Sequence, residues 1–231
     1  MKHICQNIKS INNTIKLLEN VAGTVDLVAV TKTFTYPFVL EALKCGIKHI
    51  GESKVQEAVA KFDQIGDSLI GVTKHFMGHL QSNKVKKTVE TFDLIQSLDS
   101  VKLAYNINHH AKNISKIQDC LIEVKVSKEI SKTGINPDFV ADFYNECRNL
   151  SNVNIKGLML IAPYSDNLSD SRPYFKQVYN LFKDMKFFFA DNDFNILSMG
   201  MSTDYKIAIE EGSTMVRIGS AIFGERDYGN K

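Results

Sequence analysis

The chain has 231 residues, of which 44% are hydrophobic and 23% are charged, so it can bury a sizeable core and lacks the composition of a disordered protein. Its 28 basic and 26 acidic residues leave a formal net charge of +2, which gives no electrostatic case for a nucleic-acid binder. No stretch approaches the roughly 20 apolar residues of a membrane span, and the amino-terminal segment has no apolar signal core, so we expect a cytoplasmic protein without a membrane partner.

The cysteines are widely separated in the sequence and form no CxxC pair; they are Cys5, Cys45, Cys120 and Cys147. This spacing argues against a zinc site and against a disulfide framework. We therefore expect four reduced thiols, as is usual for a protein of a reducing compartment.

Short apolar runs alternate with longer amphipathic segments along the whole chain. An amphipathic helix is predicted ahead of the first run, and further helices are predicted over 37–46, 53–65 and 137–150. The apolar runs, each predicted to contain a strand, are 25–30, 47–51, 74–80, 92–98, 120–126, 155–162, 195–201 and 215–223.

Strands that alternate with helices indicate a parallel sheet, because parallel strands need long crossover connections. An open, doubly wound sheet is one possible closure. A (β/α)8 TIM barrel is the other, and its typical size of about 250 residues suits this chain. Eight repeats without a long interruption favour the barrel, and no linker marks a boundary, so we expect one domain over 1–231. In either closure, functional groups belong at the carboxyl ends of the strands.

Lys32 follows the apolar run 25–30 directly and is therefore predicted at the mouth of the barrel. Low-dielectric surroundings disfavour the ammonium form of a lysine, and the neutral amine can form an imine with an aldehyde. The alternative is a surface lysine whose amine is in water.

The run that ends at Met201 is followed by Ser202, where a helix is predicted to begin. The unpaired N–H groups of a helix amino terminus suit a phosphate, although an ordinary helix N-cap would place a serine here as well. Gly219 and Ser220 follow the last run, and barrels often bind phosphate with the loops after their final two strands.

Arg217 interrupts an otherwise apolar strand and needs a partner, because an unpaired buried charge is costly. The partner is either a ligand acceptor, such as a ring nitrogen, or a carboxylate such as Glu52.

Weaker candidates lie along the same predicted rim, and at least one of the two histidines among them is expected to be structural; they are His75, His79, Gln81, Ser82 and Asn83. His109 and His110 are predicted to face solvent, and the segment 131–134 is compatible with a simple turn. The sequence has no GxxxxGK[ST], GxGxxG, GxSxG or HExxH motif, so there is no sign of a nucleotide loop, a nucleophile elbow or a metal site.

Six stretches from the first to the last predicted strand resemble the pyridoxal phosphate homeostasis proteins (the YggS/PROSC family), which are similar to the amino-terminal barrel of alanine racemase. The stretches are VAVTK around Lys32, GESKVQEA, HFMGHLQSNK, EVKVSKEISKTGI, IKGLMLIAP and LSMGMSTDYKIAIEEGSTMVRIGSAIFGER. The resemblance implies a fold-type III barrel that binds pyridoxal 5′-phosphate (PLP).

Carried over by motif, the resemblance implies that Lys32 forms a Schiff base with PLP and that Arg217 faces the pyridine nitrogen. It also implies that Ser202, Thr203 and Gly219 bind the phosphate, with Ser220 nearby. Two departures stand out: Ser53 replaces the family's asparagine after Gly51 and Glu52, and the segment 33–37 alters the family's Lys-x-x-Pro spacing.

A guanidinium against the pyridine nitrogen disfavours ring protonation and so weakens the ring as an electron sink. We therefore expect a non-catalytic carrier in PLP (vitamin B6) and amino-acid homeostasis, with PLP-requiring apo-enzymes as possible partners. The alternatives are a weakly active amino-acid racemase, for which Tyr164 and Tyr205 have no established place as a second base, and a Schiff-base aldolase. Few residues follow the last strand, so a racemase-type second domain is not expected and a monomer is.

Overall fold

The structure of the protein is a computed structural model, and it describes residues 2–126, 133–163 and 165–225. Within them, parallel strands form a closed barrel in the order β1 to β8, and β1 pairs with β8 to complete the ring. The strands are β1 (Asp26–Val30), β2 (His49–Glu52), β3 (Thr73–Phe76), β4 (Leu94–Leu98), β5 (Gln118–Val124), β6 (Val153–Leu160), β7 (Ile196–Ser198) and β8 (Met215–Ile218). The predicted (β/α)8 barrel is confirmed.

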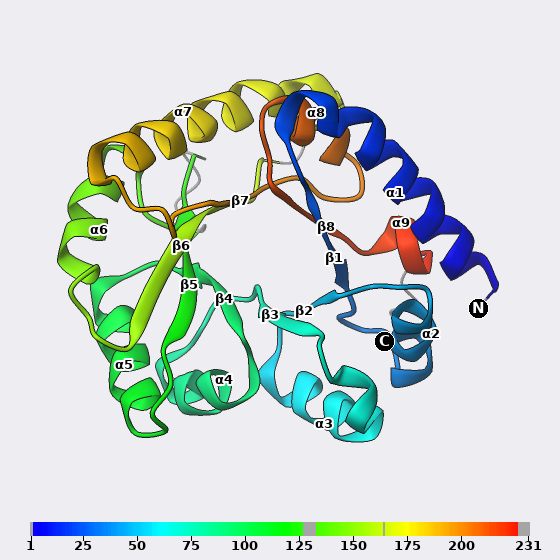
Figure 1. Cartoon of the computed structure of the whole chain (residues 1–231), viewed down its shortest axis with the longest axis horizontal. Helices are drawn as coiled ribbons and strands as arrows, with labels where there is room; N and C mark the ends of the chain where they lie inside the picture. Colours follow the sequence, from blue (N-terminus) through cyan, green and yellow to red (C-terminus); the bar gives the residue numbers. More distant parts are fainter. Residues whose placement is uncertain (1, 127–132, 164, 226–231) are drawn as a thin grey trace.

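Helices surround the barrel and cover its outer face (Figure 1). They are α1 (Lys2–Ala22), α2 (Tyr36–Lys44), α3 (Val55–Ile65), α4 (Val85–Thr91), α5 (Val101–Lys112), α6 (Val140–Cys147), α7 (Arg172–Phe189), α8 (Tyr205–Glu210) and α9 (Ser220–Phe223). The main core lies between the strands and these helices, while a small second cluster fills the interior of the barrel. None of the helices in the described part of the chain is both long enough and apolar enough to cross a membrane.

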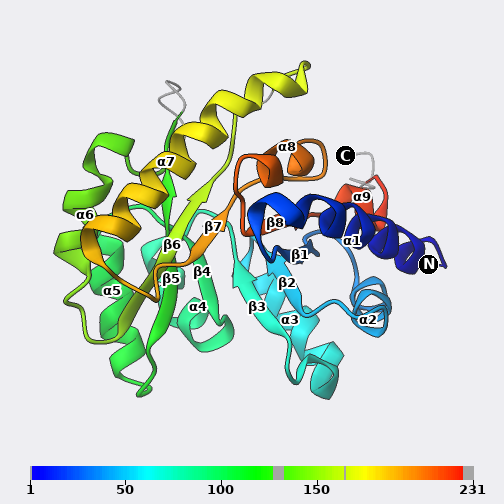
Figure 2. The same cartoon turned by 45° about the horizontal axis from the view of Figure 1, so that its top comes forward.

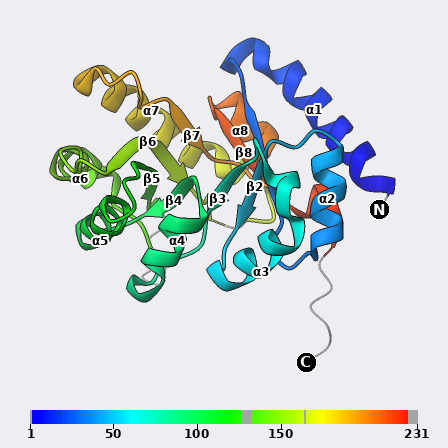
Figure 3. The same cartoon turned by 60° about the horizontal axis from the view of Figure 1, so that its bottom comes forward.

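The predicted amino-terminal helix is α1, and its buried face follows from the sequence. Ile4, Ile8, Ile11 and Ile15 are spaced by three or four residues, and all are buried. The helix packs against α2, α8 and α9, and Figures 2 and 3 show it running along that side of the barrel. It therefore contacts helices from both ends of the barrel sequence.

The last two apolar runs contain shorter strands than their length predicts. The run 195–201 was predicted to be a strand up to Met201, but β7 ends at Ser198. The run 215–223 contains β8 only as far as Ile218, and its remaining residues form α9. Apolar residues continue past both strands because the turns and α9 also pack on the core.

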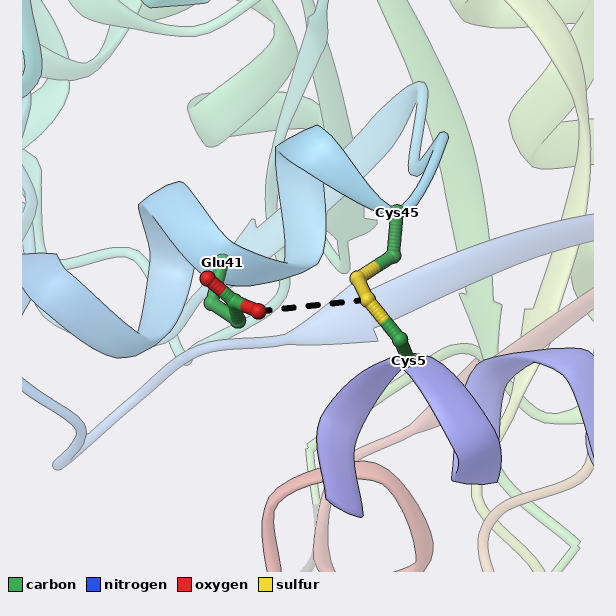
Figure 4. Close-up of a disulfide and its surroundings, with 3 residues drawn as sticks. All are labelled: Cys5, Glu41 and Cys45. Atoms are coloured by element: carbon green, nitrogen blue, oxygen red, sulfur yellow. Dashed lines mark hydrogen bonds between the residues drawn. A yellow bond between two sulfur atoms is a disulfide. The ribbon is translucent and has the colours of Figure 1, made fainter. Parts of the chain in front are cut away.

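A disulfide joins Cys5 of α1 to Cys45 at the end of α2, with the two Cα atoms 5.3 Å apart (Figure 4). Glu41 of α2 lies beside it, with Oε1 3.9 Å from Cys5 Sγ. The prediction of four reduced thiols is therefore wrong for this pair, and Cys120 and Cys147 are buried free cysteines. Sequence spacing missed the pair because only the packing of α1 on α2 brings the two residues together.

Reducing the Cys5–Cys45 disulfide is expected to lower the free energy of unfolding by about 2–4 kcal/mol, because the crosslink restricts the unfolded chain. Urea unfolding with and without a phosphine reductant measures the difference. A Cys45→Ser variant should have the lower stability under both conditions. Equal stability of the oxidised and reduced protein would contradict the prediction.

Candidate functional site

The carboxyl ends of β7, β8 and β1 lie next to one another because the barrel closes between its last and first strands. Three predicted site segments follow these strand ends: the turn at Lys32 after β1, the turn at Ser202 after β7 and the loop at Gly219 after β8. Ring closure therefore gathers residues that are nearly 190 positions apart in the sequence at one side of the barrel mouth. This is the arrangement expected of a ligand site in a (β/α) barrel.

Lys32 lies in the turn directly after β1 and is half-buried. Both neighbours of this residue are held by hydrogen bonds. The Thr31 amide donates to the Gly51 carbonyl at 2.9 Å, and the Thr33 amide donates to Glu57 Oε1 at 2.6 Å. Thr33 has a φ of 71°, in the left-handed region that costs a β-branched residue energy, so the turn needs these bonds to keep its shape.

A buried ion pair between Glu52 and Lys61 supports the Lys32 turn from below. Lys61 Nζ lies 2.6 Å from Glu52 Oε1, donates to the Thr31 carbonyl at 2.7 Å and lies 3.2 Å from Glu57 Oε1. The Thr31 hydroxyl also donates to Glu52 Oε1, at 2.6 Å. Burial raises the pKa of Glu52 despite the opposing charge of Lys61. One ammonium group thus connects β1, β2 and α3 at the residue that precedes Lys32.

Ser202 lies in a turn before α8 and not at the amino terminus of that helix, so this part of the prediction is wrong. Asp204 is at the N-cap position of α8, which begins at Tyr205, but its Oδ1 accepts the Met201 amide of the preceding turn, at 2.6 Å, and no amide of the helix. The Ser202 hydroxyl instead accepts the amides of Gly219 and Ala221, at 3.2 and 3.3 Å. This contact joins the two loops that were predicted to bind phosphate, and it leaves the hydroxyl proton available to an acceptor.

Thr203 follows Ser202 in the same turn, and Ser220 follows Gly219 as the first residue of α9. The three residues that the resemblance assigns to phosphate binding, and Ser220 beside them, are therefore brought together. They offer hydroxyl groups and backbone amides, and a phosphate oxygen accepts hydrogen bonds from both.

Arg217 lies inside the barrel on β8 and is only 5% exposed. Its guanidinium donates from Nη1 to Ser198 Oγ at 2.7 Å and from Nη2 to the Leu160 carbonyl at 2.8 Å. Burial lowers the pKa of Arg217 to about 10, against the opposing effects of Asp204 and Glu123. The alternative of an ion pair with Glu52 is wrong, because Glu52 pairs with Lys61.

The weaker candidates separate into a buried and a peripheral group. His75 is buried in the barrel and contacts Gln96 and His49, as expected of a structural histidine. His79 is exposed, with Nδ1 3.4 Å from Asp99 Oδ2. Gln81 and the single helical turn 82–84 lie on the surface near the rim.

Two further histidines and two tyrosines were considered in the sequence. His109 is exposed and His110 is half-buried, both on α5. Tyr205 is buried at the start of α8, whereas Tyr164 lies outside the described residues. The predicted turn at 131–134 also lies partly outside them, but its Thr133 hydroxyl donates to Glu123 Oε1 at 3.1 Å.

Acid is expected to destabilise the fold through His75. Burial, and then the charges of His49 and Arg217, lower the pKa of His75 from 6.5 to about 3. In the unfolded chain His75 binds a proton below about pH 6.5, whereas in the folded chain it stays neutral down to about pH 3. Between these two values the free energy of unfolding therefore falls by about 1.4 kcal/mol for each unit that the pH is lowered.

Urea unfolding at pH 7 and pH 5 should therefore differ by about 2 kcal/mol because of His75 alone. A His75→Gln variant, which cannot titrate, should lose this part of the difference, whereas His109→Gln at an exposed position should keep it. An unchanged pH dependence in His75→Gln would contradict the prediction.

Sequence reasoning missed Lys61, Gln96 and Ser198. For Gln96 and Lys61, the hydrophobic pattern of the sequence already indicates a buried position. Gln96 is a polar residue in the middle of the apolar run 92–98, as Arg217 is in its own run, and Lys61 falls on the face of the predicted helix 53–65 that carries Ala58 and Phe62. A polar side chain among buried positions needs a partner, and that requirement could have singled them out.

The model of the family described as alanine racemase, N-terminal domain, matches residues 6–227. A pyridoxal phosphate homeostasis protein of Pasteurella multocida is 37% identical over 227 residues, which cover 98% of this chain and 97% of the relative. Another, from Aquifex aeolicus, is 40% identical over 206 residues, which cover 87% of each chain.

Among solved structures, PipY of Synechococcus elongatus is 32% identical in sequence. The structure without PLP superimposes with a TM-score of 0.88, and the comparison covers 96% of this chain and all of PipY. The structure of PipY with PLP bound has a TM-score of 0.86 with the same coverage.

Proposed function

The chain belongs to the pyridoxal phosphate homeostasis proteins, within the family of the alanine racemase N-terminal domain, and from this premise we propose that it binds PLP at the mouth of its barrel as part of PLP (vitamin B6) and amino-acid homeostasis. The observation that carries the proposal is the convergence of a half-buried lysine, a bridged pair of loops rich in amide and hydroxyl donors, and a buried guanidinium. A PLP-bound structure of a relative at 32% identity supports it.

The residues present fit the cofactor by their chemistry. Ser202 holds the loops after β7 and β8 together by accepting two amides, and its own proton can be donated to a phosphate oxygen. Thr203, Gly219 and Ser220 would complete the phosphate site. Lys32, in a turn fixed from both sides, would bind the aldehyde carbon through Nζ. Bound PLP supplies a reactive aldehyde and an aromatic ring that can withdraw electrons.

Arg217 would face the ring nitrogen and keep it unprotonated, because a guanidinium can only donate hydrogen bonds. An unprotonated ring is a poorer electron sink, which supports the further proposal that the protein holds PLP without a dedicated catalytic cycle. The relatives from Pasteurella multocida and Aquifex aeolicus are both named as homeostasis proteins, which points the same way. PLP-requiring apo-enzymes are the proposed recipients.

Absorbance and intact mass of the purified protein, with added PLP and before and after borohydride, test the function. We expect a visible absorption band and, after reduction, a mass increase that corresponds to one PLP. A colourless protein that takes up no added PLP would overturn the assignment. Exchange of the α-proton of alanine for deuterium, measured on the same sample, tests the carrier against a weak racemase: rapid, saturable exchange would favour the racemase.

A Ser202→Ala variant is expected to bind PLP about fivefold to thirtyfold more weakly, because one hydrogen bond to a charged phosphate is worth roughly 1–2 kcal/mol. Dissociation constants from absorbance titration measure the change. Covalent attachment should persist, since the amides of the same loops remain. Ser169→Ala, at an exposed position beside α7, is a suitable control. An unchanged affinity would place the phosphate elsewhere.

We further propose that residues 1–231 act as one barrel domain, as a monomer, in the cytoplasm. The match of one family model to residues 6–227 supports the single domain. Light scattering tests the monomer. In a reducing cytoplasm the Cys5–Cys45 disulfide would be open, so blocking free thiols before cell lysis and then measuring the protein's mass tests the location.

A further inference from the structure

A chain of polar side chains crosses the barrel interior. The interior of such a barrel is normally filled with apolar residues, and here Val28, Leu121 and Met159 are part of an apolar cluster inside the ring. Among these, six strands each contribute one polar residue to a continuous series: Arg217 (β8), Ser198 (β7), Gln96 (β4), His75 (β3), His49 (β2) and Asp26 (β1).

The half of the series nearer the mouth is buried. Arg217 Nη1 donates to Ser198 Oγ at 2.7 Å, and Ser198 Oγ donates to Gln96 Oε1 at 2.7 Å. Gln96 Nε2 lies 2.9 Å from His75 Nδ1. The second half leads to the opposite face of the barrel: His75 Nε2 lies 3.0 Å from His49 Nδ1, and His49 Nε2 lies 3.8 Å from Asp26 Oδ1.

The Arg217 end of this series fixes the direction of every hydrogen bond from Arg217 to His49. A guanidinium can only donate, so the Ser198 hydroxyl accepts from Arg217 and must give its one proton to Gln96 Oε1. The amide nitrogen of Gln96 then donates to His75 Nδ1, which leaves the His75 proton on Nε2. That proton is donated to His49 Nδ1, so the His49 proton also lies on Nε2, facing a carboxylate that can only accept.

We propose that Ser198, Gln96 and His75 are positioning residues that, through this one-directional series, hold the Arg217 guanidinium in the orientation it presents to the PLP ring. The proposal rests on the proposed function for the identity of the ligand. The Leu160 carbonyl on Nη2 and Ser198 on Nη1 fix the guanidinium at two points, and the Ser198 hydroxyl is held in turn by its hydrogen bond to Gln96. The lowered pKa of His75 agrees with its role as a neutral link.

The proton positions can be measured without the cofactor. Long-range ¹H–¹⁵N correlation spectra of the full-length protein at neutral pH should show the proton on Nε2 in both His75 and His49, assigned through His75→Gln and His49→Gln. A proton on Nδ1 of either ring would overturn the proposal, because one link would then have two donors facing each other. This measurement stands whether or not the protein binds PLP.

The effect on Arg217 is tested with Gln96→Leu, which has a similar volume and removes the hydrogen bonds of the amide to Ser198 and His75 as well as its contact with Met215 Sδ. We expect PLP to dissociate about fivefold faster, from the loss of roughly one hydrogen bond, and its absorption maximum to shift in the direction produced by Arg217→Lys. In an Arg217→Lys background, Gln96→Leu should have no further effect on either readout, since it acts through the guanidinium. Gln177→Leu, at an exposed position on α7, is the control.

Additive effects of Gln96→Leu and Arg217→Lys, or an unshifted spectrum in Gln96→Leu, would overturn the positioning role. Ser198→Ala replaces Gln96→Leu if the latter does not fold, with the same expectations. Failure of the proposed function can be distinguished from failure of this inference. In that case the wild-type protein would take up no PLP, while the histidine spectra would still show the proton positions that the series requires.

Discussion

A Lys32→Ala variant incubated with PLP and borohydride should show no mass increase, whereas the wild-type protein gains one PLP. Covalent binding of an aldehyde requires an amine, and Lys32 is the lysine in the turn at the carboxyl end of β1, beside the loops that would hold the phosphate. The effect is complete loss, because alanine has no group that can replace the amine. Intact-mass spectrometry measures it.

Lys176→Ala, at an exposed position on α7, is the matched control and should be modified as the wild-type protein is. PLP could still bind Lys32→Ala non-covalently through the phosphate loops, and equilibrium dialysis would detect this. A PLP adduct that persists in Lys32→Ala at wild-type yield would contradict the assignment of this residue. It would indicate that another lysine binds PLP covalently.

Lys61→Met should lower the free energy of unfolding by about 3–5 kcal/mol, the usual cost of removing one partner from a buried ion pair. Methionine fills a similar volume but leaves Glu52 and the Thr31 carbonyl without the ammonium that both contact. Because Thr31 precedes Lys32, the variant should also bind PLP more weakly. Urea unfolding and PLP titration measure the two effects.

A second substitution separates the lost ion pair from lost packing. Adding Glu52→Gln to Lys61→Met removes the unpaired carboxylate and should recover part of the stability. Lys176→Met should change neither stability nor PLP binding. If Lys61→Met were as stable as the wild-type protein, the pair would not support the Lys32 turn.

The barrel could be predicted from the sequence because the features that indicate it are local. Apolar runs with helical segments between them require parallel strands with crossovers, and each run marks its own strand to within a few residues. The same order places Lys32 and Gly219 at strand ends, since a residue that follows a strand must lie at the rim. The errors at Met201 and Ser202 are local too: the Asp204 carboxylate accepts the Met201 amide in the turn ahead of α8, and the helix begins three residues later than the run predicts.

The pairing of distant side chains was decided only by the tertiary structure. Ser198 and Gln96 are 102 positions apart, and Cys5 and Cys45 are 40 apart, yet each pair is in contact. Which residues meet depends on ring closure, strand register and helix packing, and a one-residue change of register would turn these side chains to the other face. The chain by itself therefore determined the strands, their order and the rim residues, whereas the disulfide, the Glu52–Lys61 pair and the polar series that holds Arg217 exist only once the barrel is closed.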